Sequence, residues 1–233
     1  MKESIARTYD RESVIYDETR YIKNKYRYYT ACVAEKIVLR FLREGRILEL
    51  GVGTGRFAQP FSERHEYVGI DISRGMLSVA KEKLRDKVEL ILMDAESLGF
   101  KDESFDNIIC IHTFKFFPNP MKVLNESYRI LKNKGRLIIM TESKDRFFQS
   151  FTFKRCHSDI RKLYKMNRLG NLLKCAGFDI LFCKKIFVYP ITFYKIIPKQ
   201  MFKFMWKFDN SKYEVFGNEV FIVGEKNDKK DSC

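Results

Sequence analysis

The chain has 233 residues, 45% of them hydrophobic, and a formal net charge of +14, so it can enclose one α/β core. It lacks an uncharged apolar run of about 18 residues and an apolar signal core near the start, which argues against a spanning helix and a secretory leader. The six cysteines form no Cys-x-x-Cys pair, so we expect free thiols, no metal site and a cytoplasmic location.

The positive charge is concentrated in one part of the chain. Residues 144–207 carry 15 Lys or Arg and three Asp, whereas the segments on either side are close to neutral. This distribution favours an anionic partner or surface for that segment. A solvated Lys-rich face is the alternative.

The N-terminal residues contain a repeated pair, Tyr9-Asp10 and Tyr16-Asp17. A spacing of seven residues places both pairs on one face of a helix. The tyrosines either line a ligand site or only pack. Residues 27–43 follow with apolar side chains at helical spacing, which predicts an amphipathic helix that covers a sheet.

The stretch Arg46–Arg56 joins an apolar strand to a glycine-rich turn. Gly51, Gly53 and Gly55 follow the strand at once, and a helix is expected over residues 55–64. Glycines at a strand end let the backbone turn tightly and approach a ligand. The free N–H groups of the following helix would point at that ligand.

The next predicted strand, Tyr67–Ile70, ends at Asp71, where a carboxylate can accept two hydrogen bonds from ribose hydroxyls. The ligand should therefore be an adenosine-type cofactor. A dinucleotide fingerprint would place its third glycine at position 56, which is Arg56. The Gly-Lys-Ser/Thr of a phosphate-binding loop is also absent.

Ser73 is a predicted N-cap, and the helix behind it carries Met76 on its apolar stripe. A strand over residues 88–93 leads into Asp94-Ala95, where a carboxylate can accept from an adenine amino group. The following strand, residues 107–111, ends at His112. A histidine there could remove a proton near neutral pH, although a lone histidine more often packs or forms a hydrogen bond.

Strands and helices keep alternating after this point. We expect a helix that begins at Asn119-Pro120, a strand over residues 136–140, a helix over 167–176, and strands over 179–183 and 218–224, the last of them antiparallel. Gly135 is expected just past the end of the first of these helices. The alternation predicts a doubly wound, mostly parallel sheet.

An aromatic and basic segment precedes the last strand. Pro198 suits the start of a helix, on which Lys199, Lys203 and Lys207 would form one stripe beside large apolar side chains. A substrate lid, a membrane-surface helix and a partner helix would all show this pattern, as would plain packing on the sheet.

The motif Glu49-x-Gly51-x-Gly53-x-Gly55, followed by acidic residues at the ends of the next two strands, resembles the cofactor site of class I S-adenosylmethionine-dependent methyltransferases. The resemblance extends over nearly all of the chain, and residues 46–141 carry its specific motifs. It implies an α/β fold with a doubly wound, seven-stranded mixed sheet of the Rossmann-like type.

The same resemblance implies the domain organisation. Residues 1–226 would form a single methyltransferase domain, with helices over 1–43 as an N-terminal cap. Residues 143–215 would form an insertion on the substrate side. The polar end, residues 227–233, is expected to be a disordered tail.

The implied cofactor is S-adenosyl-L-methionine, with S-adenosyl-L-homocysteine as its product. The residues expected to bind it are Tyr16, Glu49, Gly51, Gly53, Gly55, Asp71, Ile72, Met76, Asp94, Ala95 and His112. The positive sulfonium already activates the methyl group, so the protein needs placement and exclusion of water more than a strong base. The catalytic residues are therefore not identified by the sequence, and Tyr16, His112 and His157 are the candidates.

The resemblance is to small-molecule enzymes related to quinone and sterol biosynthesis, and it implies transfer to O, N or C of an apolar or amphipathic acceptor. The extra C-terminal signature of the quinone enzymes is absent. Methylation of a peptide or RNA through residues 144–207, peripheral membrane contact, and a non-enzymatic cofactor-binding module are the alternatives. The tetrapeptide His112–Lys115 lacks the Asn/Asp-Pro-Pro-Tyr/Phe element of methyltransferases that act on amino groups of adenine or glutamine. The sequence does not identify the acceptor, the methylated atom or the oligomeric state.

Overall fold

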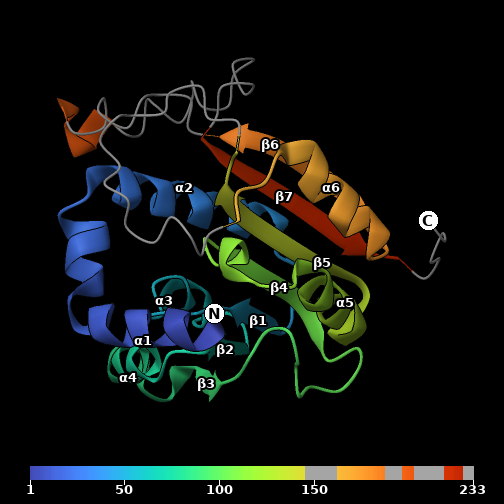
Figure 1. The fold of residues 1–233 in the computed structure, drawn as a ribbon, viewed down its shortest axis with the longest axis horizontal. Coiled ribbons are helices and arrows are strands. Elements are labelled where there is room, and N and C mark those ends of the chain that lie inside the picture. The colour runs from blue at the N-terminus through green and yellow to red at the C-terminus, as the bar shows by residue number, and fades with distance from the viewer. Residues whose placement is uncertain (145–161, 187–195, 202–217, 228–233) are drawn as a thin grey trace.

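A seven-stranded sheet forms the centre of the computed structural model, which describes residues 1–144, 162–186, 196–201 and 218–227 (Figure 1). The strand order is β3-β2-β1-β4-β5-β7-β6. The strands are β1 (Ile47–Leu50), β2 (Tyr67–Asp71), β3 (Glu89–Leu92), β4 (Phe105–Ile111), β5 (Leu131–Glu142), β6 (Phe178–Ile186) and β7 (Glu219–Lys226).

The pairing of the strands confirms the predicted doubly wound mixed sheet. Strands β1 to β5 pair in parallel, and β7 lies antiparallel between β5 and β6. The chain order reverses between β1 and β4, which are neighbours in the sheet. In such sheets a crevice opens at the carboxyl ends of the strands where the order reverses, and ligands bind there.

Helices cover both faces of this sheet (Figure 1). One core cluster joins α2, α3 and α4 to the strands, and a second joins α5 and α6 to them. The α-helices are α1 (Lys2–Glu12), α2 (Lys25–Phe41), α3 (Ala58–Phe61), α4 (Arg74–Leu84), α5 (Pro120–Ile130) and α6 (Met166–Cys175). Shorter turns are η1 (Ser13–Ile15), η2 (Glu18–Ile22), η3 (Arg85–Lys87), η4 (Phe114–Phe116) and η5 (Lys199–Met201).

Local capping explains where the two best-predicted helices begin. The Ser73 side chain accepts from the Met76 N–H at the start of α4, as predicted. At the start of α5 the Asn119 side chain accepts from the Lys122 N–H, and Pro120 occupies the first helical position.

The prediction that Tyr9 and Tyr16 lie on one face of a helical segment is confirmed, since their rings meet edge to face, although η1 and η2 interrupt the α-helix. Two other local predictions were wrong. The helix expected over 55–64 is the single turn α3, and it begins late because Gly55 has a φ of +75°, which a right-handed helix does not allow. Gly135 does not directly follow the helix, because α5 ends at Ile130 and β5 begins at Leu131, and the left-handed residue in this stretch is Lys134, with φ of +61°.

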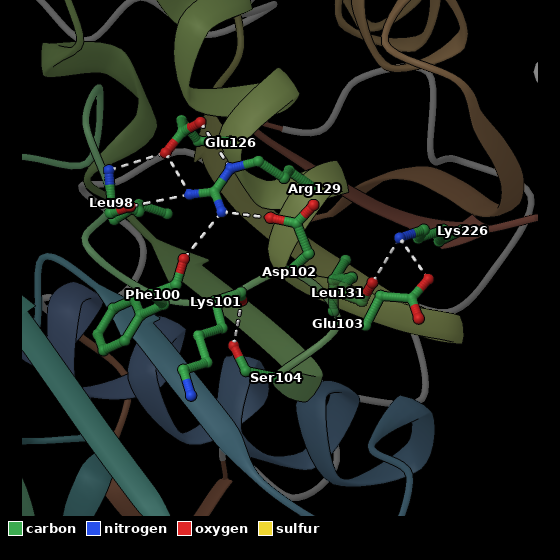
Figure 2. A network of polar contacts seen from close by, with 10 residues as sticks. All are labelled: Leu98, Phe100, Lys101, Asp102, Glu103, Ser104, Glu126, Arg129, Leu131 and Lys226. Atoms are coloured by element: carbon green, nitrogen blue, oxygen red, sulfur yellow. Dashed lines mark hydrogen bonds and ion pairs between the residues drawn. The ribbon is translucent and has the colours of Figure 1, made fainter.

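A network around Arg129 fixes the connection between β3 and β4 (Figure 2). From α5, its guanidinium donates to the carbonyls of Phe100 and Leu98, each at 2.8 Å, and to the Asp102 carboxylate at 2.7 Å. Glu126 holds the same guanidinium and also accepts from the Leu98 N–H at 2.9 Å. This network fixes the course of the loop that follows the Asp94-Ala95 turn.

Part of the prediction lies outside the described residues. His157, Lys203 and Lys207 fall there, and only the turn η5 represents the helix expected after Pro198. Within the described part of the chain, no helix is long and apolar enough to cross a membrane.

Candidate functional site

A cavity opens at the carboxyl ends of β1, β2 and β4, and the N-terminal segment forms one of its walls. It encloses about 1500 Å³ of empty space, its open mouth included. Ten of the eleven residues expected to bind the cofactor line it: Tyr16, Glu49, Gly51, Gly53, Asp71, Ile72, Met76, Asp94, Ala95 and His112. Gly55 does not, because it faces α4, where a Cβ would lie 2.5 Å from the Leu84 side chain.

The glycine turn brings bare backbone to the cavity wall. Gly51 has φ of +75°, and its N–H donates to the Ile70 carbonyl at 2.8 Å. A Cβ at this position would lie 2.4 Å from the Thr113 side chain. Conformation and space therefore both require glycine here.

Replacing Gly51 with Ala is expected to destabilise the protein by about 1–3 kcal/mol, because the substitution combines left-handed strain with a clash. Gly170→Ala is the matched control, since Gly170 lies within α6 and a Cβ there meets nothing within 4 Å. The control should stabilise the protein by up to about 1 kcal/mol. Urea denaturation measures both, and equal effects of the two substitutions would contradict this account of the turn.

Asp71 ties the glycine turn to the end of β2. Its two carboxylate oxygens accept from the Gly53 N–H and the Ser73 N–H, each at 2.9 Å. Burial raises the pKa of this carboxyl group, and the backbone donors oppose that shift. The side chain is thus held in one orientation at the cavity wall, with lone pairs left for further donors.

Glu49 lies deeper, on the central strand β1, where it is only 2% exposed. Its carboxyl group accepts from the Tyr67 hydroxyl at 2.7 Å. Burial raises the pKa of Glu49 to about 8, although the tyrosine hydrogen bond favours the ionised form. With no cation beside it, this group is therefore largely protonated at pH 7.

Lys2 of α1 reaches the turn that follows β3. Its ammonium group lies 2.5 Å from an Asp94 carboxylate oxygen and 2.7 Å from a Glu96 carboxylate oxygen. The other Asp94 oxygen accepts from the Glu96 N–H at 2.9 Å. The acidic end of the cavity is therefore neutralised in part by the first residues of the chain.

Two aspartates fasten the N-terminal segment across the cavity. Asp10 accepts from the Ser73 hydroxyl at 2.6 Å and from the Gly75 N–H at 2.8 Å. Asp17 accepts from the Thr54 hydroxyl at 2.6 Å and pairs with Lys83. In the Tyr-Asp repeat it is therefore the aspartates, rather than the tyrosines, that make the bonds holding the segment in place.

The tyrosines of the repeat lie on the cavity side of this segment. The rings of Tyr9 and Tyr16 meet edge to face with centroids 6.1 Å apart, and Tyr9 meets Phe116 at 5.6 Å. Burial raises the pKa of Tyr16, so its hydroxyl stays protonated near neutral pH. Tyr16 can donate a hydrogen bond there but is no base.

His112 directly follows β4 in a left-handed conformation, with φ of +61°. Its side chain is 16% exposed, and its Nδ1 lies 3.7 Å from a Glu219 carboxylate oxygen. Burial and the nearby cations Arg27 and Lys115 lower the pKa of His112 well below its usual value. The ring is therefore neutral at pH 7 and a weak proton acceptor.

Sequence reasoning missed the charged group beside His112. Arg27 from α2 and Lys115 from η4 line the cavity, and both contact the same carboxylate oxygen of the buried Glu142. A signal existed only for Lys115, which stands four residues after β4 among aromatic residues. Nothing in the sequence links three residues so far apart.

Comparisons with known proteins agree with this architecture. Residues 48–139 match the family model of a methyltransferase domain. The phosphatidylethanolamine N-methyltransferase of Cereibacter sphaeroides is 38% identical over 103 residues, which are 42% of this chain and 51% of the relative. The demethylmenaquinone methyltransferase of Thermotoga maritima is 40% identical over 98 residues, which are 41% of this chain and 42% of the relative. The chain thus spans about half the length of these relatives.

A solved structure aligns over nearly the whole chain. It is a Thermotoga maritima S-adenosylmethionine-dependent methyltransferase, described as a possible histamine N-methyltransferase. The TM-score is 0.71 at 25% identity, and the alignment covers 95% of this chain and 99% of the other. Sheet order, glycine turn and sequence are thus all similar to those of class I S-adenosylmethionine-dependent methyltransferases.

Proposed function

We propose that this chain binds S-adenosylmethionine in the cavity and transfers its methyl group to a small-molecule acceptor. When bound, the cofactor supplies a methyl group activated by a positively charged sulfur. The observation that carries the proposal is the meeting of the bare Gly51–Gly53 backbone with three carboxyl groups, those of Glu49, Asp71 and Asp94, in one cavity.

The residues present fit this cofactor. The Asp71 oxygens suit ribose hydroxyls, and Asp94 suits an exocyclic amino group. Met76 and Ile72 add apolar surface to the lining of the same cavity. A pyrophosphate at the turn would meet the carboxyl groups of Glu49 and Asp71, and the nearby Arg56 lies 3.8 Å from Glu35, so a dinucleotide fits less well.

The remaining cavity residues suit positioning and exclusion of water rather than strong base catalysis. His112 is neutral and a weak proton acceptor, and Tyr16 keeps its proton. Both can orient an acceptor through hydrogen bonds while the N-terminal segment keeps water away. An acceptor with an ionised or unprotonated attacking atom would need no more than this.

A small acceptor is favoured because α1 and η1 pack on α4 beside the cavity and Asp10, Asp17 and Lys2 fasten this cover. The relatives are named for an N-methyltransferase acting on phosphatidylethanolamine and for a demethylmenaquinone methyltransferase. These names leave the methylated atom open. We treat residues 1–226 as one domain, as the single continuous sheet supports.

The proposal is tested by the fate of a labelled methyl group. Purified protein is incubated with methyl-labelled S-adenosylmethionine and three fractions of a cell extract: small molecules with lipids, proteins, and RNA. Label should enter the first fraction. Label confined to protein or RNA would replace this proposal with the polymer alternative and assign a role to residues 144–207.

The cover should respond to loss of the Asp10 anchor. Asp10→Ala removes two hydrogen bonds to the start of α4, so hydrogen exchange in residues 2–22 should rise and the affinity for S-adenosylhomocysteine should fall about tenfold. Glu3→Gln is the matched control, because it removes a carboxylate from the exposed face of the same helix. Equal exchange in the two variants would show that Asp10 does not hold the cover.

A further inference from the structure

Two cations face the cavity on its β4–β5 side. Lys115 Nζ and Arg27 Nη2 lie 2.7 Å and 3.0 Å from one oxygen of Glu142, and the Lys115 and Glu142 side chains are 5% and 3% exposed. Arg27 and Lys115 line the cavity, whereas Glu142 lies behind them. The cavity therefore meets the donors of the group and not its carboxylate.

Charge in the described lining is unevenly placed. Its acidic residues, Glu49, Asp71 and Asp94, belong to strands β1 and β2 and to the turn after β3. The cations on that side have carboxylate partners: Lys2 pairs with Asp94, and Arg56 lies 3.8 Å from Glu35. On the β4–β5 side the charged lining residues are Arg27 and Lys115, and Arg20 adds a third cation over the Tyr16 ring at 5.6 Å. Because the donors of Arg27 and Lys115 face the cavity and the Glu142 carboxylate lies behind them, an anionic acceptor would gain charge-assisted hydrogen bonds there and a cationic one would not.

Aromatic rings line the cavity next to these cations. Tyr9, Tyr16 and Phe116 form a connected group, and Lys115 Nζ lies 5.2 Å from the Phe116 ring centroid. Such walls bury a flat apolar body, while polar groups at one end fix its orientation. The cationic part of the cavity wall therefore suits an anionic end of a small molecule, and the aromatic part suits its flat apolar body.

We propose that Arg27 and Lys115 bind an anionic oxygen of the methyl acceptor, whose flat apolar body lies against Tyr9, Tyr16 and Phe116. Glu142 is a positioning residue, because it holds both cations through one oxygen. This inference rests on the proposed function, since it concerns the acceptor half of the same cavity. It assigns recognition of negative charge to this buried pair rather than to the lysine stripe expected after Pro198.

Three isosteric probes test the sign of the charge directly. Protein saturated with S-adenosylhomocysteine is titrated with benzoate, benzamide and benzamidine, which share a planar shape and differ in charge, and with phenyl phosphate as a second anion. The anions should bind at least about tenfold more tightly than benzamide, and benzamidine should not bind. Equal binding of benzoate and benzamide, a preference for benzamidine, or no binding of either anion at millimolar concentration would overturn the inference.

Variants then locate the site. Lys115→Met should weaken benzoate binding at least about tenfold and leave the affinity for S-adenosylhomocysteine within about twofold. Lys122→Met, which removes an exposed lysine of α5, is the matched control and should change neither. If Lys115→Met instead weakens S-adenosylhomocysteine binding, the cation serves the carboxylate of the cofactor, and the inference fails while the proposed function stands.

A second variant keeps the inference testable if Lys115→Met fails to fold. The double variant Lys115→Met/Glu142→Gln removes one charge of each sign, so the net charge of the group is unchanged, and the new amide oxygen can still accept from Arg27. It should fold and still fail to prefer benzoate over benzamide. Absence of S-adenosylhomocysteine binding to the unmodified protein is a separate result, which would contradict the proposed function itself.

Discussion

Replacing Asp71 with Ala should lower the affinity for S-adenosylmethionine and S-adenosylhomocysteine about a hundredfold. The proposed ribose contacts are two hydrogen bonds to a carboxylate, and losing both costs about 3 kcal/mol. The substitution also removes the acceptor for the Gly53 and Ser73 N–H groups, which loosens the turn. Isothermal calorimetry with each ligand measures the effect.

Asp106→Ala is the matched control for this variant. Asp106 accepts from the Arg46 N–H at 2.8 Å and pairs with Lys132 at the opposite end of the sheet, and it does not line the cavity. Its loss should reduce stability but leave cofactor affinity unchanged. If the Asp71 variant bound the cofactor as tightly as the control does, the assignment of the ribose site would be wrong.

The second large effect concerns pH and the sulfonium charge. In the empty cavity Glu49 has a pKa of about 8, so it is protonated at pH 6. A positively charged sulfur close by would favour the ionised form, and binding of S-adenosylmethionine would then release a proton. Its affinity relative to S-adenosylhomocysteine should rise by up to about tenfold per pH unit as the pH approaches 8, and level off above that value.

Glu49→Gln should abolish this slope, because no proton is left to release. The comparison of the two ligands cancels the titration of every group that both of them meet. Competition binding at pH 6, 7 and 8 provides the measurement, and a ligand ratio that is independent of pH in the unmodified protein would remove the proposed role of Glu49.

The stability of the empty protein has the opposite pH dependence at Glu49. A carboxyl group whose folded-state pKa is raised contributes stability that is fully present below about pH 4.5 and is lost as the pH rises towards 8. Removing its charge with Gln should flatten that part of the stability curve. Glu49 thus lowers the stability of the cofactor-free protein as the pH rises above about 4.5. The same residue favours S-adenosylmethionine over S-adenosylhomocysteine when it ionises beside the sulfonium.

Local signals explain which parts of the fold could be predicted. Ser73 and Asn119 cap their helices through side-chain bonds within three residues, and both helix starts were predicted correctly. The apolar runs of β1 and β2 are central strands, and the acidic residues after them follow from chain order alone. The family resemblance supplied the antiparallel place of β7.

Contacts between distant residues explain what the sequence could not show. Arg27, Lys115 and Glu142 meet across 115 positions of the chain, on three different elements. The late start of α3 depends on the positive φ of Gly55, which a pattern of apolar residues does not reveal. Asp10 and Asp17 hold the N-terminal segment through contacts with the start of α4 and with the Thr54 hydroxyl, which no local sequence pattern shows.

The central claim is that this cavity selects S-adenosylmethionine among adenosine cofactors. Calorimetric titration of the unmodified protein with S-adenosylmethionine, S-adenosylhomocysteine, NAD and ATP tests it most directly. We predict one site per chain for the first two ligands and no measurable heat for NAD or ATP. Absence of binding by the first two, or binding of NAD with equal affinity, would contradict the claim.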